Sequence, residues 1–252
     1  MRHVWLSTCL TLALSAANVL QAIESSPSDT EDSRNLVREA WEAERSGKAA
    51  EAIALCRQSG DAARTAGDRE VILESLRCEA VVRMDEERYE DARRLLRLEV
   101  EVSAEVGRPS EPIVSALSLI ATAYESESDR RAAIHEWEKA LLVGRDLSDT
   151  LLLTPLQRVG YAAFESGEDQ RAERLIDRYV TAYRKVYSDE ALALINPWLA
   201  DYYVKTKRIE EAREIYKMRI AFYRRFEDKR SELAKAVAEY EAFLAAHDKL
   251  NP

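Results

Sequence analysis

Side chains that commonly carry acid–base or metal chemistry are few in this chain. It has three histidines and three cysteines. Neither His135 nor His247 has a second histidine or a cysteine at the spacing of a zinc site. His135 directly precedes Glu136, and adjacent residues on a helix do not face each other, so this pair does not form a proton-transfer site. The sequence therefore predicts no catalytic residue, no metal site and no cofactor.

Phosphate binding and hydrolysis are also not supported by the sequence. Gly47 and Lys48 resemble the end of a phosphate-binding loop, but Glu42 stands where that loop needs its first glycine. We interpret Gly47 and Lys48 as a turn between helices. Carboxylates alternate with arginines as on a salt-bridged helix surface, and no pair stands out for glycoside hydrolysis. No serine has a recognisable base or oxyanion loop.

One stretch near the C-terminus combines positive charge with aromatic rings. It contains Arg213, Tyr216, Lys217, Arg219, Phe222, Tyr223, Arg224, Arg225 and Phe226. Such a face could grip an acidic peptide or a polyanion. The glutamates close enough to pair with these cations are Glu210, Glu211, Glu214 and Glu227. Because the rings are also needed to pack a following helix, we favour a salt-bridged packing face.

The elements that would position any site are helical hairpins. In residues 118–141, small or apolar side chains fall at helical spacing on both sides of a polar turn, namely Ala121, Tyr124, Ala133, Ile134, Trp137 and Ala140. Two amphipathic helices therefore face each other across this turn. Seven glycines and six prolines in 252 residues leave little room for a turn-rich β fold. The sequence predicts an all-helical protein.

The hairpin recurs along the chain. Alanines flanked in the same way are separated by 40, 41, 39 and 40 residues, namely Ala52, Ala92, Ala133, Ala172 and Ala212. Twelve residues before each stands a small residue, where two helix backbones can approach: Ala40, Ala80, Ala121, Gly160 and Ala200. Four residues after each alanine stands an apolar side chain on the same helix face: Cys56, Leu96, Trp137, Ile176 and Tyr216. We expect the small and the bulky sites to interlock.

These residues resemble the tetratricopeptide repeat, a helix–turn–helix unit with small residues in its first helix and an alanine early in its second. The resemblance covers residues 33–227. A small residue is expected late in the second helix. One repeat has it as Ala140, whereas the others have Ser59, Glu99, Tyr179 and Arg219 at this position. The turn glycine is kept only as Gly47 and Gly167. The spacing exceeds the roughly 34 residues of the common form and is similar to kinesin light chain repeats.

The resemblance implies an all-α fold, a right-handed α-α superhelix of about five hairpins that occupies residues 33–252 and leaves no room for a second domain. A capping helix is expected at 231–247. Its inward side chains would be Leu233, Val237, Tyr240 and Leu244, with Lys235 and Glu239 pointing away. Pro197 lies within the first helix of the fifth repeat, where we expect a kink.

Composition and charge limit the classes of partner. The chain is 46% hydrophobic and 33% charged, which fits a globular protein. Its formal net charge is −9, and from residue 149 onward acidic and basic side chains are equal in number. The negative charge therefore comes from the residues before 149. Since an acidic protein is not drawn to nucleic acid by its net field, we expect no nucleic-acid binding.

The first 22 residues differ from the rest of the chain. Arg2 and His3 precede an apolar run from 4 to 14, and Ala22 is a possible cleavage site. This pattern is typical of a secretory signal peptide and predicts an extracytoplasmic location, periplasmic or secreted. An uncleaved membrane anchor over residues 4–23 stays open as the alternative. Residues 23–32 are polar and acidic, and we expect a flexible linker there.

The two cysteines beyond the leader are expected to be neighbours. Cys56 falls in the second helix of repeat one and Cys78 in the first helix of repeat two. An oxidising compartment favours a disulfide between them, whereas each position also suits a small buried thiol. Both interpretations stay open at this point.

The family resemblance implies a concave groove, lined by first helices, that binds a protein or peptide partner. The inward positions best suited to contact it are Trp41, Arg77, Val81, Tyr161, Phe164 and Asp201. Chaperone-binding members of the family clamp a terminal carboxylate with asparagine and lysine, and this groove has neither. We therefore predict a non-catalytic scaffold or adaptor for a helical or extended segment of another envelope or secreted protein. A solenoid enzyme with a carboxylate site and a self-assembly module stay open as alternatives.

Overall fold

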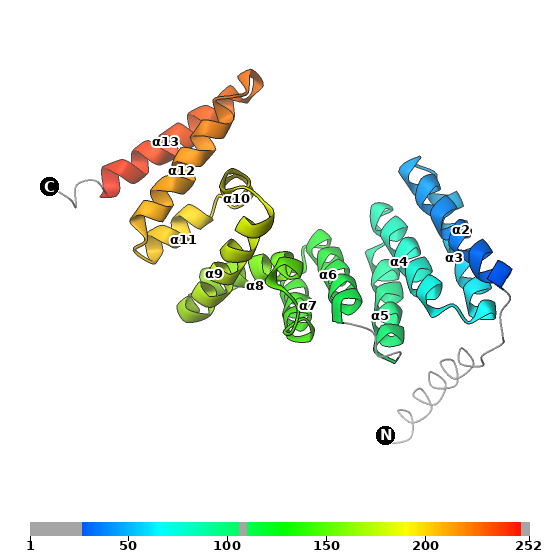
Figure 1. The fold of residues 1–252 in the computed structure, drawn as a ribbon. Coiled ribbons are helices and arrows are strands. Elements are labelled where there is room, and N and C mark those ends of the chain that lie inside the picture. Colours follow the sequence, from blue (N-terminus) through cyan, green and yellow to red (C-terminus); the bar gives the residue numbers. More distant parts are fainter. Residues whose placement is uncertain (1–26, 106–109, 248–252) are drawn as a thin grey trace. The chain divides into compact units, whose positions relative to one another are not determined.

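The computed structural model describes residues 27–105 and 110–247, and every element in these ranges is a helix (Figure 1). The chain divides into two compact units, unit 1 from Met1 to Leu147 and unit 2 from Ser148 to Pro252. The repeat domain expected for residues 33–252 is thus shared between two units. The predicted leader, residues 1–22, lies outside the described residues.

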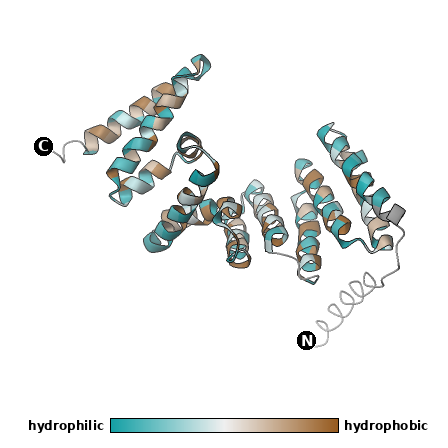
Figure 2. Ribbon diagram, viewed as in Figure 1, coloured by the Kyte–Doolittle hydropathy of each residue, from teal (hydrophilic) through white to brown (hydrophobic). Residues whose placement is uncertain are grey.

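Unit 1 consists, within its described residues, of three helical hairpins. Their helices are α2 (Pro27–Arg45) and α3 (Ala49–Ala66), α4 (Arg69–Asp85) and α5 (Tyr89–Glu105), and α6 (Ser110–Ser126) and α7 (Arg130–Val143). Each helix packs against the next one along the chain, and α2 also packs against α4. The first helices of the first two repeats therefore lie side by side. Figure 2 shows hydrophilic and hydrophobic residues alternating along these helices, as expected when one face of each is buried.

Helix α2 begins within the segment expected to be a linker. The prediction of a flexible linker over 23–32 is wrong for residues 27–32, which are helical. Pro27 is tolerated in the first turn of a helix because the N–H it lacks has no intrahelical partner there. The acidic residues that indicated a linker also suit the positive end of the helix dipole.

Unit 2 begins with a short 3₁₀ helix and one regular hairpin, η1 (Asp149–Leu151), α8 (Leu153–Glu165) and α9 (Asp169–Val186). In place of a continuous first helix, the next repeat has two seven-residue helices, α10 (Asp189–Ile195) and α11 (Leu199–Lys205). The kink expected at Pro197 is therefore a complete break. The chain continues with α12 (Ile209–Tyr223), η2 (Glu227–Lys229) and α13 (Arg230–His247).

The same turn closes each hairpin of the described residues. Its central residue has a left-handed backbone conformation, with φ from 60° to 76°, at Gly47, Glu87, Ser128, Gly167 and Lys207. The following N–H bonds to a carbonyl five residues earlier, for example from Lys48 to Ala43 at 2.9 Å. This pattern is the Schellman motif, which satisfies carbonyls at the end of a helix. The turn is therefore constant even where its glycine is replaced.

The predicted interlocking of small and bulky residues is confirmed. The five recurring alanines and the small residues opposite them are buried in every repeat. Gly160 shows why size matters at this position, because a Cβ atom built on it would lie 3.0 Å from Cγ1 of Ile176 and 3.3 Å from Cβ of Leu175. These separations are tighter than ordinary van der Waals contact, so a larger residue at this position would require its neighbours on α9 to shift.

The disulfide left open by the sequence is present in the structure. Cys56 of α3 and Cys78 of α4 are joined, with their Cα atoms 6.1 Å apart. Both side chains are buried beside Ala40 of α2. The bond therefore links the first repeat covalently to the second.

The late position of the second helices, where the family favours a small residue, is buried in all five repeats. Each polar residue there has a matched partner from another helix. Ser59 donates to the carbonyl of Ser33 at 2.7 Å. The larger side chains also pair with residues outside their own helix. Glu99 accepts a hydrogen bond from Arg77, and the hydroxyl of Tyr179 accepts one from Asn196. Arg219 donates a hydrogen bond to Glu239. A large polar residue is tolerated there because each one has at least one hydrogen-bond partner on a neighbouring segment.

The capping helix α13 is present, but its buried face differs from the prediction. Ala236 and Phe243 are its buried residues, and Phe243 packs on the ring of Tyr216 with centroids 5.1 Å apart. Leu233, Val237 and Leu244 are only half-buried. Glu239, expected to point away, pairs with Arg219 of α12 at 2.8 Å. Tyr240 faces inward as predicted and stacks on Tyr216, so the packed face of α13 includes the expected side and extends to Phe243 and Glu239.

Candidate partner-binding groove

A pocket of about 460 Å³ lies in unit 1 on the side of the first helices. It is lined by Trp41 of α2, by Glu70, Leu73, Glu74 and Arg77 of α4, by Glu99 of α5 and by Pro112 of α6. The pocket thus takes residues from all three repeats of the unit. It brings together two of the predicted groove residues, Trp41 and Arg77.

Trp41 is held in place by the core of the unit. Its ring packs against buried residues of α2, α3 and α4, among them Val37, Ile72 and Cys78. The side chain is nevertheless only partly buried and lines the pocket with the remainder of its surface. Trp41 therefore presents a fixed aromatic surface that loses little conformational entropy when a partner binds.

Arg77 is engaged within the protein. Its guanidinium pairs with the buried carboxylate of Glu99 and donates to the backbone carbonyl of Pro112 at 3.4 Å. One side chain of α4 is therefore tied to α5 and to α6. Because its charge is neutralised by Glu99, Arg77 has a structural role in the pocket, where it links α4 to α5 and α6.

The remaining carboxylates of the pocket differ in their pairing. Glu70 has an interaction partner within the described residues. Glu74 is exposed and forms no ion pair or hydrogen bond within the part of the chain that the structure describes. Since the Arg77–Glu99 pair is neutral, the pocket has a negative character. Val81 lies on α4, half-buried, but outside the lining of this pocket.

Two predicted groove residues of unit 2 lie together on α8. Tyr161 packs on Trp198 with ring centroids 4.9 Å apart and lies 6.5 Å from Phe164. Phe164 meets the edge of Tyr202 at 5.8 Å, and the ammonium of Lys205 lies 5.0 Å from its ring. Trp198 and Tyr202 were missed by the sequence analysis. The only signal for Trp198 was its place directly after a helix-breaking proline.

Phe164 also lines a pocket of about 240 Å³ in unit 2, between α8, α9 and α11. Tyr202 lines the same pocket, and its buried hydroxyl has no hydrogen-bond partner among the described residues. Burial, together with the nearby Asp177, raises the pKa of Tyr202 to about 12. This hydroxyl therefore stays protonated at neutral pH.

The sixth predicted residue, Asp201, lies on α11 and lines none of these pockets. Partial desolvation of its carboxyl group, with a smaller effect of Glu239, raises its pKa. Arg219 opposes this rise because its positive charge favours the carboxylate.

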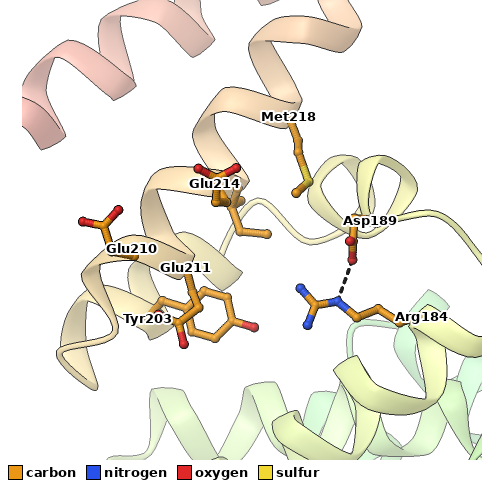
Figure 3. Close-up of a pocket in the computed structure, with 8 residues that line it drawn as sticks. Arg184, Asp189, Tyr203, Glu210, Glu211, Glu214 and Met218 are labelled. Atoms are coloured by element: carbon orange, nitrogen blue, oxygen red, sulfur yellow. Dashed lines mark hydrogen bonds and ion pairs between the residues drawn. The ribbon is translucent and has the colours of Figure 1, made fainter.

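A further pocket of unit 2, of about 320 Å³, was not expected from the sequence (Figure 3). Four carboxylates line it, and each has its own cation in the pairs Asp189–Arg184, Glu210–Arg213, Glu211–Arg208 and Glu214–Lys217. A hydrogen bond from Arg208 lowers the pKa of Glu211. This pocket is therefore internally neutralised despite its acidic lining.

The cationic and aromatic stretch of α12 packs as expected. Tyr216 stacks on Tyr240 of α13 with ring centroids 5.9 Å apart. Its cations pair with carboxylates, as Lys217 does with Glu214 at 2.8 Å. The guanidinium of Arg225 pairs with Glu190 and lies 5.4 Å from the ring of Phe222. The prediction of a salt-bridged packing face is confirmed for this part of the stretch, whereas Phe226 at its end is exposed.

The described residues contain neither a metal-binding cluster nor a membrane-spanning helix. Within residues 27–105 and 110–247, no three histidine, cysteine, aspartate or glutamate side chains are grouped as a metal ion would require. In the same ranges, no helix combines the length and the apolar character needed to cross a membrane.

Comparison with solved structures identifies the fold. The chain is similar over 82% of its length to the kinesin light chain TPR-like repeats of Podosopora anserina, with a TM-score of 0.55, 20% identity and 97% of that chain covered. It is similar to a Rap protein complexed with competence and sporulation factor, with a TM-score of 0.56 and 12% identity over 88% of this chain and 66% of that one.

A third similar structure is a signal transduction ATPase with a tetratricopeptide repeat sensor from Pyrococcus horikoshii. The TM-score is 0.66 at 12% identity, over 88% of this chain and 38% of that one. No family model and no curated protein sequence matches the chain. The structural neighbours are tetratricopeptide-like repeat proteins, and the predicted fold class is confirmed.

Proposed function

We propose that this tetratricopeptide-like protein is a non-catalytic scaffold that binds a peptide or helix of a partner protein. The binding surface is the pocket formed by α2, α4 and α6 of unit 1, to which Trp41 contributes a fixed, partly exposed ring. Aromatic side chains in pockets commonly dominate the energy of protein interfaces. The observation that carries this proposal is that one pocket spans three repeats.

The fold of the neighbours supports this proposal. Among the similar structures, a Rap protein is complexed with competence and sporulation factor. A solenoid groove of this kind recognises a partner through an extended or helical segment. We propose the site in unit 1, where Trp41 and Arg77 line the same pocket, and treat Tyr161 and Phe164 of unit 2 as a second candidate contact surface.

The test is a quantitative pull-down from the envelope fraction with the wild-type chain and with Trp41→Ala. We expect the bound partner to be lost from Trp41→Ala. Leu98→Ala is the matched control, because Leu98 is an exposed hydrophobic residue of α5 outside the pocket. Circular dichroism checks that both variants fold. Equal recovery by wild type and Trp41→Ala would refute the groove, and Tyr161→Ala tests the surface of unit 2 in the same way.

We also propose that the chain works in an extracytoplasmic compartment, after removal of residues 1–22. The leader-like sequence supports this location, and the buried Cys56–Cys78 disulfide fits an oxidising environment. Cell fractionation and the intact mass of the purified chain test the proposal. A protein found in the cytosol with residues 1–22 still attached and with reduced cysteines would contradict the proposal.

A further inference from the structure

We propose that the groove of unit 1 receives a basic side chain, a lysine or arginine, from an extended segment of the partner protein. This inference rests on the proposed function, because it names the chemistry of the segment that the same pocket binds. Three features of the pocket carry it: a carboxylate without a partner among the described residues, an aromatic and apolar wall, and the absence of a free cation among the described residues that line it.

The unpaired carboxylate is the most informative feature. Glu74 lines the pocket, is exposed, and has no ion-pair partner within the described residues. The pocket of Figure 3 in unit 2 offers the contrast, because all four of its carboxylates have a cation from the same unit. A carboxylate without an internal partner can pair with a cation supplied by a ligand.

The walls of the pocket suit the rest of such a side chain. Trp41 provides an aromatic surface, and Pro112 and the small exposed part of Leu73 add apolar surface on neighbouring helices. Lysine and arginine have an aliphatic stem that covers apolar surface while the charged end stays polar. A cation close to a tryptophan ring also gains attraction from the ring quadrupole. The ligand could therefore lie along Trp41 and reach Glu74 with its charged end.

Arg77, the one cation among the described residues that line the pocket, does not oppose a basic ligand. Arg77 is paired with Glu99, whose side chain is almost completely buried, so this pair contributes little net charge. The net charge of −9 comes from residues before 149, the part of the chain that forms unit 1. A negative field of this kind raises the association rate of positively charged segments.

The test is calorimetric titration of the full chain with two synthetic peptides of alternating lysine and leucine, one free and one with every lysine acetylated. We expect the free peptide to bind at least tenfold more tightly than the acetylated peptide. Glu74→Gln should reduce this preference to threefold or less. Glu101→Gln is the matched control, since Glu101 is an exposed residue of α5 outside the pocket and the change in net charge is the same.

The outcomes separate this inference from the proposed function. Equal binding of both peptides, lost in Trp41→Ala, would leave the groove as a peptide site and overturn its preference for basic residues. Equal loss of affinity in Glu74→Gln and Glu101→Gln would also overturn the inference, because it would indicate a general charge effect. Binding of neither peptide, or binding that does not depend on Trp41, would overturn both.

Discussion

Units 1 and 2 use the same hairpin, the same turn and an arginine–glutamate pair between helices, Arg77–Glu99 and Arg219–Glu239, but they differ in what else joins neighbouring repeats. In unit 1 a disulfide joins the first two repeats. In unit 2 an uncharged network centred on Asn196 lies at the helix break. The hairpin backbone therefore does not dictate how repeats are joined, and the side chains at a few late positions decide it.

The two units also differ in the state of their acidic pockets. Each carboxylate of the pocket of Figure 3 pairs with a cation of unit 2, although only Arg184 of these cations lines the pocket, whereas Glu74 in the groove of unit 1 has no partner among the described residues. Surface ion pairs contribute little to the free energy of unfolding, so leaving one carboxylate without a partner lowers it only slightly. An unpaired carboxylate beside an aromatic ring is then more informative about binding than a larger group of paired carboxylates.

Removal of the disulfide should give the largest difference between the units. The bond closes a loop with a sequence separation of 22 residues. The Cys56→Ala/Cys78→Ala variant should lose about 3 kcal/mol of unfolding free energy in unit 1, mainly because its unfolded chain is less restricted. Hydrogen exchange should quicken in α3 and α4 and stay unchanged in α9 and α12. A uniform change in both units would contradict this separation.

Alkaline pH should weaken unit 2 specifically through its buried tyrosines. Burial raises the pKa of Tyr179 and of Tyr202 from 10.0 to about 12. Each therefore contributes stability that is fully present below pH 10 and is lost as the pH rises towards 12, on the order of 2 kcal/mol for each residue. Circular dichroism during urea unfolding at several pH values measures the loss. Tyr179→Phe should reduce the pH dependence, and an unchanged profile would contradict the assignment.

Asn196 should be the most sensitive uncharged polar residue of unit 2. It is buried at the helix break, accepts from Gln157 at 2.6 Å and donates to Tyr179 and to the carbonyl of Leu192, each at 2.9 Å. Asn196→Ala should lower the unfolding free energy by about 2 kcal/mol, because buried polar groups lose their partners. Thermal unfolding checks this value.

A matched substitution in unit 1 controls for the loss of an asparagine. Asn35 of α2 makes an exposed hydrogen bond with Arg38. Asn35→Ala should therefore change the unfolding free energy by much less than Asn196→Ala. Equal effects of the two substitutions would show that the buried network at the helix break has no special role.

The smallest expected effect concerns a feature that both units share. Glu87 in unit 1 and Lys207 in unit 2 take the left-handed conformation that costs an L-residue more than glycine. Glu87→Gly and Lys207→Gly should each raise the unfolding free energy by about 0.5 to 1 kcal/mol. Chemical denaturation measures both variants. A gain in only one unit would indicate that the two turns are not equivalent.

Much of the fold could be predicted because the repeat is a local pattern. The hairpin at residues 118–141 and its four counterparts follow from helical spacing, and the turn positions follow from the same register. The start of α2 was missed because an acidic segment fits both a linker and a helix N-terminus. The packing of Phe243 and the pairing of Glu239 were missed because both depend on partners on α12.

The candidate groove was predictable only in part. Position in the repeat identified Trp41 and Arg77, which the structure brings into one pocket. It did not identify Glu74, the lining carboxylate without a partner among the described residues. It also did not identify Pro112, which lies in the first turn of α6, on the next repeat. Carboxylates are numerous in the sequence, and only the distances between helices show which of them has a partner.

The sequence by itself determined the all-helical class, the period of about forty residues and the places where helices approach closely. These features depend on neighbours within one hairpin, so they are encoded in local spacing. The tertiary structure decided which late second-helix residue pairs with which partner, how far Pro197 interrupts its repeat, and which carboxylate stays free to meet a ligand. Those outcomes depend on side chains from different helices, whose distances exist only once the chain has packed.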